Sequence, residues 1–387
     1  MTNYKTKIKQ ARREIVAIMR SGLNQIFGLL ATVLLLATCG LVSGAGHTDK
    51  IFLSQPLTIK WRYISDQTTD LTPVSDESKI YLPLLGGKIV ALNASDGQLR
   101  WQSDAGGEFS ASPAADNRSV YVATEYETVV DGQKRLHGAL RALSRETGVT
   151  LWMRTVQAPL HGRLVAGDNA VFGGGIDGRV QAFDKNSGRT LWATQYSASF
   201  SSQPQLSENH LYIGSEDGTL LALDKENGEI AWRYRTRGPV RGPVAIVNKL
   251  VYFGSGDGYV YAVREPGAHL LWRRRTGAGI QAVAAVENGL LVASLDNFVY
   301  FFSLNGGHHL WRRLLPGRIA SQPATAADGA LFTPLSGENA IVLGLRDGKP
   351  VNTLPLGEEN SRNASPIIAA QFVLVTTAHG LLAFAGP

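Results

Sequence analysis

The sequence predicts an all-β protein, an eight-bladed β-propeller of four-stranded antiparallel blades, and three observations support this prediction. Tryptophans recur with a nearly constant period, each period contains β-rich stretches separated by turn residues, and the two ends of the repeat region hold complementary parts of one repeat. The successive intervals are 40, 51, 40, 40, 40 and 39 residues, between Trp61, Trp101, Trp152, Trp192, Trp232, Trp272 and Trp311. All seven tryptophans of the chain follow this period, so chance is a poor explanation.

The clearest repeat spans residues 211–232 and predicts three successive strands, LYIGS, TLLALD and EIAWRY. Asp217-Gly218 and Asn227-Gly228 separate these strands, because glycine tolerates the positive φ that a tight hairpin turn requires. A fourth strand comes either from Gln203–Leu206 before the repeat or from Gly242–Ala245 after it.

Two repeats depart from this pattern. The repeat that ends at Trp152 is longer than the others by 11 residues. The additional residues fall around Glu125–Glu127 and Asp131-Gly132, so we expect its first hairpin to project from one face of the propeller. The repeat over Leu331–Leu354 keeps the strand pattern but has Asn352 where the other repeats have tryptophan.

The two ends of the repeat region complement each other. Residues 58–63 predict an outer strand that contains Trp61, but the strands that should precede it are missing. Near the C-terminus, three strands are predicted at 366–368, 372–380 and 381–384, and no tryptophan strand follows them. We therefore expect the Trp61 strand to pair with Leu381–Phe384 and complete an eighth blade, since a closed ring leaves no open interface between blades.

The N-terminal segment predicts export from the cytoplasm. Residues 26–46 carry no charge, and a basic stretch precedes them. Three interpretations remain open: a lipoprotein signal in which Cys39 is lipidated, an uncleaved transmembrane anchor, or a signal peptide cleaved near Ser43–Ala45. We divide the chain into a signal or anchor segment (1–46), a linker (47–57) and the propeller (58–387). A lipoprotein signal is favoured over a transmembrane anchor, and all three interpretations place the propeller outside the cytoplasm.

Charge and cysteine content exclude several functional classes. The formal net charge is +6, but six of the 38 basic residues and one of the 32 acidic residues precede residue 39. The remainder of the chain is nearly neutral, which gives no indication of nucleic-acid binding. Cys39 is the only cysteine, so the sequence predicts no intrachain disulfide, cysteine-rich metal site or C-x-x-C-H haem site.

No catalytic, cofactor or metal site is predicted, and we expect a protein that is not an enzyme. Residues 173–178 match G-x-G-x-x-G, but they lie between two strands, whereas a dinucleotide site requires a helix after the turn. The histidines show no metal-ligand spacing, and the adjacent His308 and His309 would point to opposite faces of a strand.

Arginines follow three consecutive tryptophans, and we expect them to cluster on neighbouring blades. They either protect exposed outer strands from edge-to-edge association or form a docking patch for an acidic partner or lipid headgroups. The members of this patch are Arg233, Arg235, Arg237, Arg273, Arg274, Arg275, Arg312 and Arg313.

A second candidate surface is the central funnel, where polar or small residues precede the proline of most predicted inner strands. They suit a hydrated channel or a weak ligand site. These residues are Thr72, Ser112, Gln203, Gly242, Gln322 and Ser365.

Within the repeats, alanine, aspartate or asparagine, glycine and tryptophan occur at positions i, i+2, i+6 and i+10, as in Ala222, Asp224, Gly228 and Trp232. This spacing resembles the tryptophan-docking repeat of the pyrroloquinoline-quinone-like (PQQ-like) eight-bladed propellers. Together with the lipobox-like Cys39, the chain resembles the BamB family of outer-membrane assembly lipoproteins. In such a repeat the tryptophans pack between neighbouring blades as core residues.

The resemblance implies a non-catalytic envelope scaffold without a cofactor. Its expected partners are envelope proteins, it would attach to the membrane through its N-terminus, and the propeller would be monomeric. Two alternatives remain: a ligand-binding protein, sensor or quinoprotein-like enzyme that uses the central funnel, or a structural module of another envelope complex.

Overall fold

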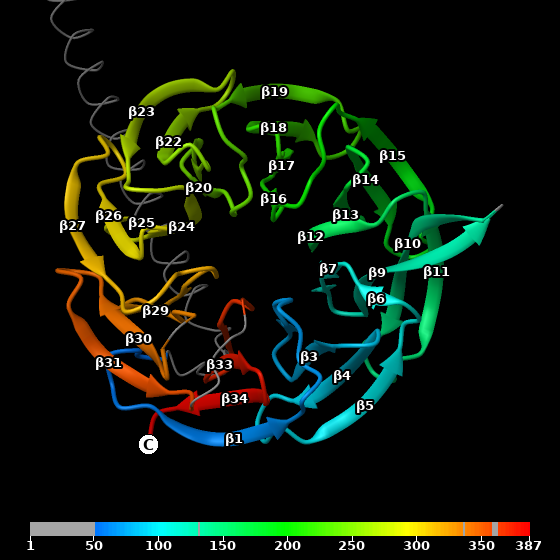
Figure 1. The fold of residues 1–387 in the computed structure, drawn as a ribbon, viewed down its shortest axis with the longest axis horizontal. Helices are drawn as coiled ribbons and strands as arrows, with labels where there is room; N and C mark the ends of the chain where they lie inside the picture. The colour runs from blue at the N-terminus through cyan, green and yellow to red at the C-terminus, as the bar shows by residue number, and fades with distance from the viewer. Residues whose placement is uncertain (1–50, 131, 336, 358–362) are drawn as a thin grey trace, which may run out of the picture. The chain divides into compact units, whose positions relative to one another are not determined.

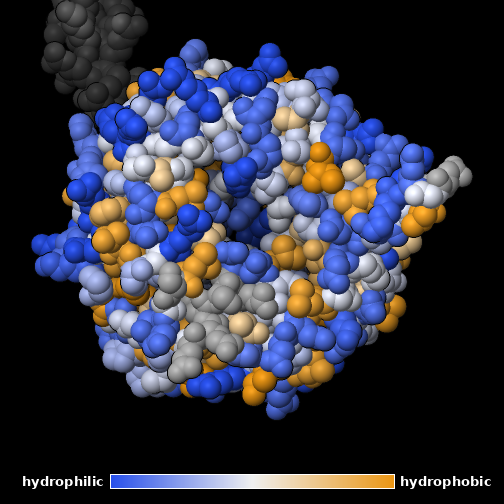
Figure 2. Space-filling view, in the orientation of Figure 1, coloured by the Kyte–Doolittle hydropathy of each residue, from blue (hydrophilic) through white to orange (hydrophobic). Residues whose placement is uncertain are grey.

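The computed structural model describes residues 51–130, 132–335, 337–357 and 363–387, which contain β-strands and no helix. The predicted signal or anchor segment, with Cys39, and the first part of the predicted linker lie outside these residues. None of the described residues forms a helix that is long and apolar enough to cross a membrane. The strands form eight sheets arranged as blades in a ring, which confirms the predicted eight-bladed propeller (Figure 1). The space-filling view shows a central channel (Figure 2).

Each blade runs from an inner strand beside the channel to an outer strand on the rim, and blades are numbered in chain order. Blade 1 contains β2 (Val74–Ser75), β3 (Lys79–Leu84), β4 (Lys88–Asn93) and β5 (Leu99–Asp104). Blade 2 contains β6 (Glu108–Phe109), β8 (Ala114–Ala115), β9 (Ser119–Val130), β10 (Gln133–Ser144) and β11 (Thr150–Val156), whereas β7 (Ala111–Ser112), from the same segment of the chain, pairs with the inner strand of blade 3. Blade 3 contains β12 (Leu160–Ala166), β13 (Ala170–Gly175), β14 (Arg179–Asp184) and β15 (Thr190–Gln195). Blade 4 contains β16 (Gln205–Leu206), β17 (His210–Gly214), β18 (Thr219–Asp224) and β19 (Ile230–Arg235).

The second half of the ring follows the same order. Blade 5 contains β20 (Ala245–Val247), β21 (Leu250–Gly254), β22 (Tyr259–Arg264) and β23 (His269–Arg275). Blade 6 contains β24 (Ile280–Val286), β25 (Gly289–Ser294), β26 (Phe298–Phe302) and β27 (His309–Leu314). Blade 7 contains β28 (Ala324–Thr325), β29 (Gly329–Phe332), β30 (Asn339–Gly344) and β31 (Pro350–Pro355). Blade 8 contains β32 (Ile367–Ala369), β33 (Phe372–Thr377), β34 (Gly380–Ala385) and β1 (Thr58–Ile64).

Blade 4 shows which of the two candidate segments, Gln203–Leu206 or Gly242–Ala245, supplies its fourth strand. Gln205 of β16 pairs with Tyr212 of β17, so the inner strand comes from the segment that precedes the repeat. The middle strand β18 is almost completely buried because both of its faces contact neighbouring blades, whereas Trp232 is the only buried side chain of the outer strand β19. This difference in burial explains why the middle strands are continuous apolar runs, whereas the outer strands mix buried and exposed residues.

The long repeat forms the predicted extended hairpin. β9 and β10 contain 12 residues each. They are paired along their whole length, from Ser119 opposite Ser144 to Val130 opposite Gln133. Figure 1 shows this hairpin projecting beyond the rim of blade 2.

Blade 8 combines strands from both ends of the described chain, and Figure 1 shows β1 beside β34. The two strands are antiparallel, with Trp61 opposite Ala383 and Tyr63 opposite Leu381. Side chains of this sheet are buried against both neighbouring blades: Phe372 belongs to the same apolar cluster as Leu82 of blade 1, and Val373 to the same cluster as Leu331 of blade 7.

The tryptophan of one blade packs on the glycine turn of the next. Trp61 donates from Nε1 to the Ala94 carbonyl oxygen at 3.1 Å, and a Cβ placed on Gly97 would lie 2.4 Å from its ring. The same donor contact occurs at Trp101, Trp152, Trp192, Trp272 and Trp311. All seven tryptophans are buried except Trp152, which is partly buried. In six of the seven blades with a tryptophan, the indole therefore lies on a turn residue that has no side chain.

Blade 5 departs from this arrangement. Ala268, with a positive φ of 55°, occupies the position that glycine has in the other turns, and it packs in one cluster with Trp232. Within the described residues, the Nε1 of Trp232 has no hydrogen-bond partner.

Candidate functional site

Strand register identifies one equivalent position in the inner segment of every blade. It lies two residues before the inner-strand residue that is in register with the tryptophan position of the outer strand. In blade 4, Gln205 pairs with Tyr212, Tyr212 with Ala222 and Ala222 with Trp232, so the position is Gln203. The eight equivalent residues are Thr72, Ser112, Arg163, Gln203, Pro243, Ala282, Gln322 and Ser365. Five of the predicted funnel residues occupy this position, and Gly242 precedes it by one residue. Arg163 is the only charged member.

Three of the predicted funnel residues link blades to one another. The backbone N–H of Ser365 donates to Thr72 Oγ1 at 3.0 Å, and the N–H of Thr72 donates to Ser112 Oγ at 3.1 Å. The N–H of Gln322 donates to Ser365 Oγ at 3.0 Å. The three hydroxyl side chains are buried, so they satisfy backbone donors between blades 7, 8, 1 and 2. Their small polar character therefore has a structural cause.

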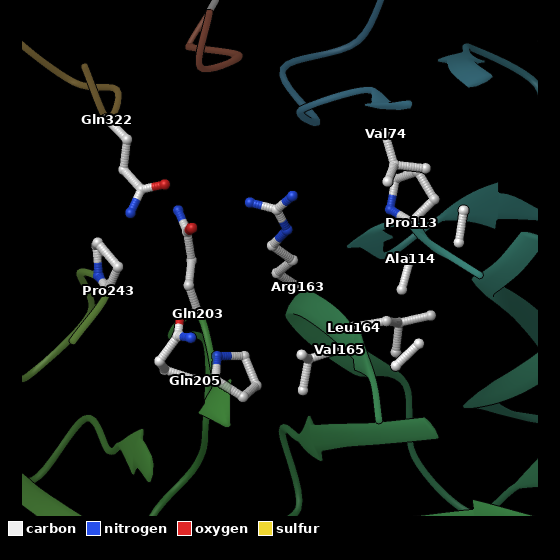
Figure 3. Close-up of a pocket in the computed structure, with 13 residues that line it drawn as sticks. Val74, Pro113, Ala114, Arg163, Leu164, Val165, Gln203, Gln205, Pro243 and Gln322 are labelled. Atoms are coloured by element: carbon white, nitrogen blue, oxygen red, sulfur yellow. The ribbon is translucent and has the colours of Figure 1, made fainter. Parts of the chain in front are cut away.

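A cavity of about 310 Å³ opens on the channel beside these positions. Figure 2 shows a hydrophilic hollow at the centre of the ring. The cavity combines amide and guanidinium groups with apolar wall residues, and Figure 3 shows the side chains of Gln203 and Gln322 pointing toward each other beside Arg163. The lining residues are Val74, Pro113, Ala114, Ala115, Arg163, Leu164, Val165, Ala166, Gln203, Pro204, Gln205, Pro243 and Gln322.

Arg163 is held at the cavity by its backbone. β7, in the segment that leads into blade 2, pairs in parallel with β12, and this pairing places Arg163 opposite Ser112. Its side chain forms no hydrogen bond or ion pair with the residues that the structure describes, and burial lowers the pKa of Arg163 below its usual value. The guanidinium is thus an unpaired cation directed into a confined space.

Arg163 was not among the predicted funnel residues, because those residues were chosen as the ones that precede a proline of an inner strand. In blade 3, Leu164 occupies the position of that proline, and Gly162, with a positive φ of 76°, precedes Arg163. Aligning the inner strands by their pairing partners, instead of by proline, would have placed Arg163 in the funnel.

The predicted arginine patch lies on and just beyond β19, β23 and β27, the outer strands of three consecutive blades (Figure 1). Two of its members contact the next blade. Arg274 Nε donates to the Gly307 carbonyl oxygen at 2.6 Å, and Arg313 Nε donates to the Gly348 carbonyl oxygen at 2.8 Å. These two side chains bind turns between blades and are not available as a docking surface.

The other six arginines of the patch are exposed. Arg235 forms an ion pair with Asp217 at 3.2 Å. The guanidinium groups of Arg273 and Arg312 lie over the rings of Tyr259 and Phe298, at 4.9 and 5.2 Å from the ring centroids. In the described part of the chain, no carboxylate forms an ion pair with five of them, which we name the rim arginines: Arg233, Arg237, Arg273, Arg275 and Arg312.

Metal coordination has no evident site in the described ranges. They contain no group of three or more histidine, cysteine, aspartate or glutamate side chains that could hold a metal ion. The predicted lipidation residue Cys39 lies outside these ranges, so the structure gives no geometry for it.

Comparison with known proteins gives a family match over nearly the whole propeller. A family model described as outer membrane protein assembly factor BamB matches residues 55–134, 136–265 and 237–385. Among curated proteins, outer membrane protein assembly factor BamB of Shewanella oneidensis is 33% identical over 82 residues. That alignment covers 21% of this chain and 18% of the relative, so it spans less than a fifth of the relative's length.

Three solved structures share the fold. BamB from Moraxella catarrhalis superimposes with a TM-score of 0.71 at 18% identity and covers 85% of this chain and 97% of its own. The computationally designed Ika8 protein superimposes with a TM-score of 0.72 at 14% identity, and the match covers 84% of this chain and 99% of the designed chain. Quinohemoprotein alcohol dehydrogenase from Comamonas testosteroni superimposes with a TM-score of 0.67 at 12% identity, and the match covers 86% of this chain and 77% of the dehydrogenase chain. At these identities the likeness concerns the fold alone.

Proposed function

The chain belongs to the family described as outer membrane protein assembly factor BamB, and from this premise we propose that it is a non-catalytic scaffold in the assembly of outer-membrane proteins. The observation that carries the proposal is the family match, which extends from residue 55 to residue 385. The scaffold would act in the periplasm as a monomeric propeller and would bind other envelope proteins. It would need no cofactor for this role.

Attachment to the membrane is assigned to the N-terminal segment. We propose that residues 1–46 direct export and that Cys39 carries the lipid, since Leu36-Ala37-Thr38-Cys39 resembles a lipobox and lies within the uncharged run of residues 26–46. A Cys39→Ser variant should then fractionate with soluble periplasmic proteins, while the unmodified chain fractionates with membranes. Equal recovery in the membrane fraction would instead favour the transmembrane anchor.

The rim arginines are the surface that we assign to a protein partner. Charged residues on outer strands also prevent edge-to-edge pairing, but that role requires only charge. Here the guanidinium groups of Arg273 and Arg312 rest on aromatic rings, which restricts their motion and lowers the entropy lost on binding. Five exposed cations without an ion-pair partner among the described residues suit an acidic surface on the partner.

The experiment is crosslinking in intact cells followed by identification of the captured proteins. The test variant changes the rim arginines to glutamine: Arg233→Gln, Arg237→Gln, Arg273→Gln, Arg275→Gln and Arg312→Gln. The control changes four exposed basic residues on or just before the outer strands of other blades: Lys60→Gln, Arg62→Gln, Arg100→Gln and Arg189→Gln.

We expect the unmodified chain to capture components that assemble outer-membrane proteins, the control variant to capture them equally, and the rim variant to lose most of them. Equal capture by both variants would remove the docking surface but keep the scaffold. If the unmodified chain captures no such component, the scaffold proposal is wrong.

A further inference from the structure

Arg163 is the only ionisable residue among those that line the channel cavity. The other polar side chains in the lining are the amides of Gln203, Gln205 and Gln322, and the remaining lining residues are apolar. Amides can donate hydrogen bonds to an anion but cannot neutralise a cation. The cavity therefore carries one uncompensated positive charge.

An unpaired charge in a confined space destabilises a fold unless something balances it. The channel gives Arg163 some access to solvent, but surrounding protein already lowers its pKa, which is the expected effect of lost hydration on a cation. The other seven equivalent positions are neutral, so the propeller architecture does not require a charge here. An anionic ligand would supply the missing counter-charge.

We propose that this cavity binds a small molecule through a carboxylate group, with Arg163 as the anchor and Gln203 and Gln322 as flanking hydrogen-bond donors. This binding site goes beyond the scaffold function. The planar guanidinium can donate two parallel hydrogen bonds to a carboxylate. In Figure 3 the two glutamine amides lie on one side of Arg163, where they can reach the same bound group.

Charge and size define the ligand class. One guanidinium balances one negative charge, whereas a phosphate monoester carries about −1.5 to −2 at neutral pH and would remain undercompensated. The walls are apolar at Pro113, Leu164, Val165 and Pro204, which suits a short hydrocarbon body attached to the carboxylate. The volume of about 310 Å³ is at the lower end of the range for ligand cavities, so the ligand is small.

The test is isothermal titration of the full-length protein with hexanoate, with hexanamide as the neutral control, at constant ionic strength. Hexanoate should bind saturably and hexanamide should bind at least about tenfold more weakly, because hydrogen bonds to charged groups contribute about 1.5–3 kcal/mol. Arg163→Gln should weaken hexanoate binding by the same factor. Arg189→Gln, an exposed change just before the outer strand of the same blade, should leave it unchanged.

Arg163→Lys provides a second variant if the glutamine variant fails to fold. It keeps the charge but loses the two-pronged geometry, so hexanoate affinity should fall between those of the unmodified protein and Arg163→Gln. Absence of saturable hexanoate binding by the unmodified protein would overturn the proposal. Equal affinity of the unmodified protein and a folded Arg163 variant would also overturn it.

Discussion

Asn352 of β31 donates a hydrogen bond from Nδ2 to the carbonyl oxygen of Leu53, at 3.0 Å and across 299 positions of sequence. The same Nδ2 donates to the Gln55 carbonyl oxygen at 2.6 Å. Asn352 pairs opposite Val342 and thus occupies the position of tryptophan in the other blades. Blade 8 has no turn between β34 and β1, because these strands come from opposite ends of the chain. A tryptophan would have no glycine turn to pack on, and an amide binds the entering chain instead.

Asn352→Ala should lower the free energy of unfolding by about 1–2 kcal/mol, because two carbonyl oxygens lose their donor. Urea unfolding followed by tryptophan fluorescence measures this change. Asn209→Ala, an exposed asparagine on blade 4, is the matched control and should change stability by less than about 0.5 kcal/mol. Equal stability of the two variants would show that the contact with Leu53 does not stabilise the fold.

Acid should weaken the attachment of the same segment at Asp328. Its carboxylate accepts the backbone N–H groups of Leu53 at 3.0 Å and Ser54 at 2.7 Å. Burial alone would raise the pKa of Asp328, but hydrogen bonds from Ser54 and Leu53 outweigh it and lower the pKa below the usual value. The stabilisation is therefore complete above the unfolded pKa of about 3.9 and is lost as pH falls through the lower folded pKa.

Asp328→Asn should remove the contribution of the Asp328 carboxylate to the pH dependence of the free energy of unfolding. We expect the variant to be less stable than the unmodified protein at pH 7, and the difference should shrink as pH falls below about 4. Unfolding midpoints measured from pH 7 to pH 2 test this. Asp168→Asn changes an exposed carboxylate and serves as control. A stability difference that stays constant over this pH range would contradict the assignment.

Two substitutions in the turns beneath tryptophans, Gly228→Ala and Ala268→Gly, should have different effects on the free energy of unfolding. In Gly228→Ala, the new Cβ would lie 2.4 Å from the ring of Trp192 at a φ of +74°. Strain and overpacking should together cost about 2–5 kcal/mol.

Ala268→Gly should be neutral or stabilising by up to about 1 kcal/mol, because it relieves an alanine with positive φ at some cost in chain entropy. Chemical denaturation of both variants measures the contrast. If Gly228→Ala proved as stable as the unmodified protein, the explanation of the repeat spacing would be wrong.

Thr72→Val should destabilise the link between blades 8 and 1. The buried N–H of Ser365 donates to Thr72 Oγ1, and valine would leave that donor without a partner. The expected cost is about 1–3 kcal/mol in the free energy of unfolding. Thr72→Ser keeps the hydroxyl and should lose only the contribution of one methyl group, about 1 kcal/mol. A serine variant that is less stable than the valine variant would refute the role of the hydroxyl.

Features encoded within one repeat could be predicted from the sequence. The strands of blade 4, the hairpin turn at Asp217-Gly218 and the extended β9–β10 hairpin follow from apolar runs and turn residues that are close in sequence. The spacing of tryptophan also predicted the period of the blades, and the prediction of eight came from combining this period with the complementary strands at the two ends of the repeat region. These signals are local, so one sequence suffices to read them.

The arrangement of side chains between blades could not be predicted in this way. Arg274 and Arg313 looked like members of a surface patch, but they bind carbonyl groups of the next blade. Thr72 and Ser365 looked like channel residues, but they join two blades.

The sequence by itself thus determined that this chain builds eight similar sheets, since turn geometry and apolar periodicity act within a repeat. Only the tertiary structure decided which side of each strand meets the channel, the rim or the adjacent blade. It placed Arg163 in the channel cavity and Asn352 against Leu53, because these positions depend on strand register and on packing between segments far apart in the chain.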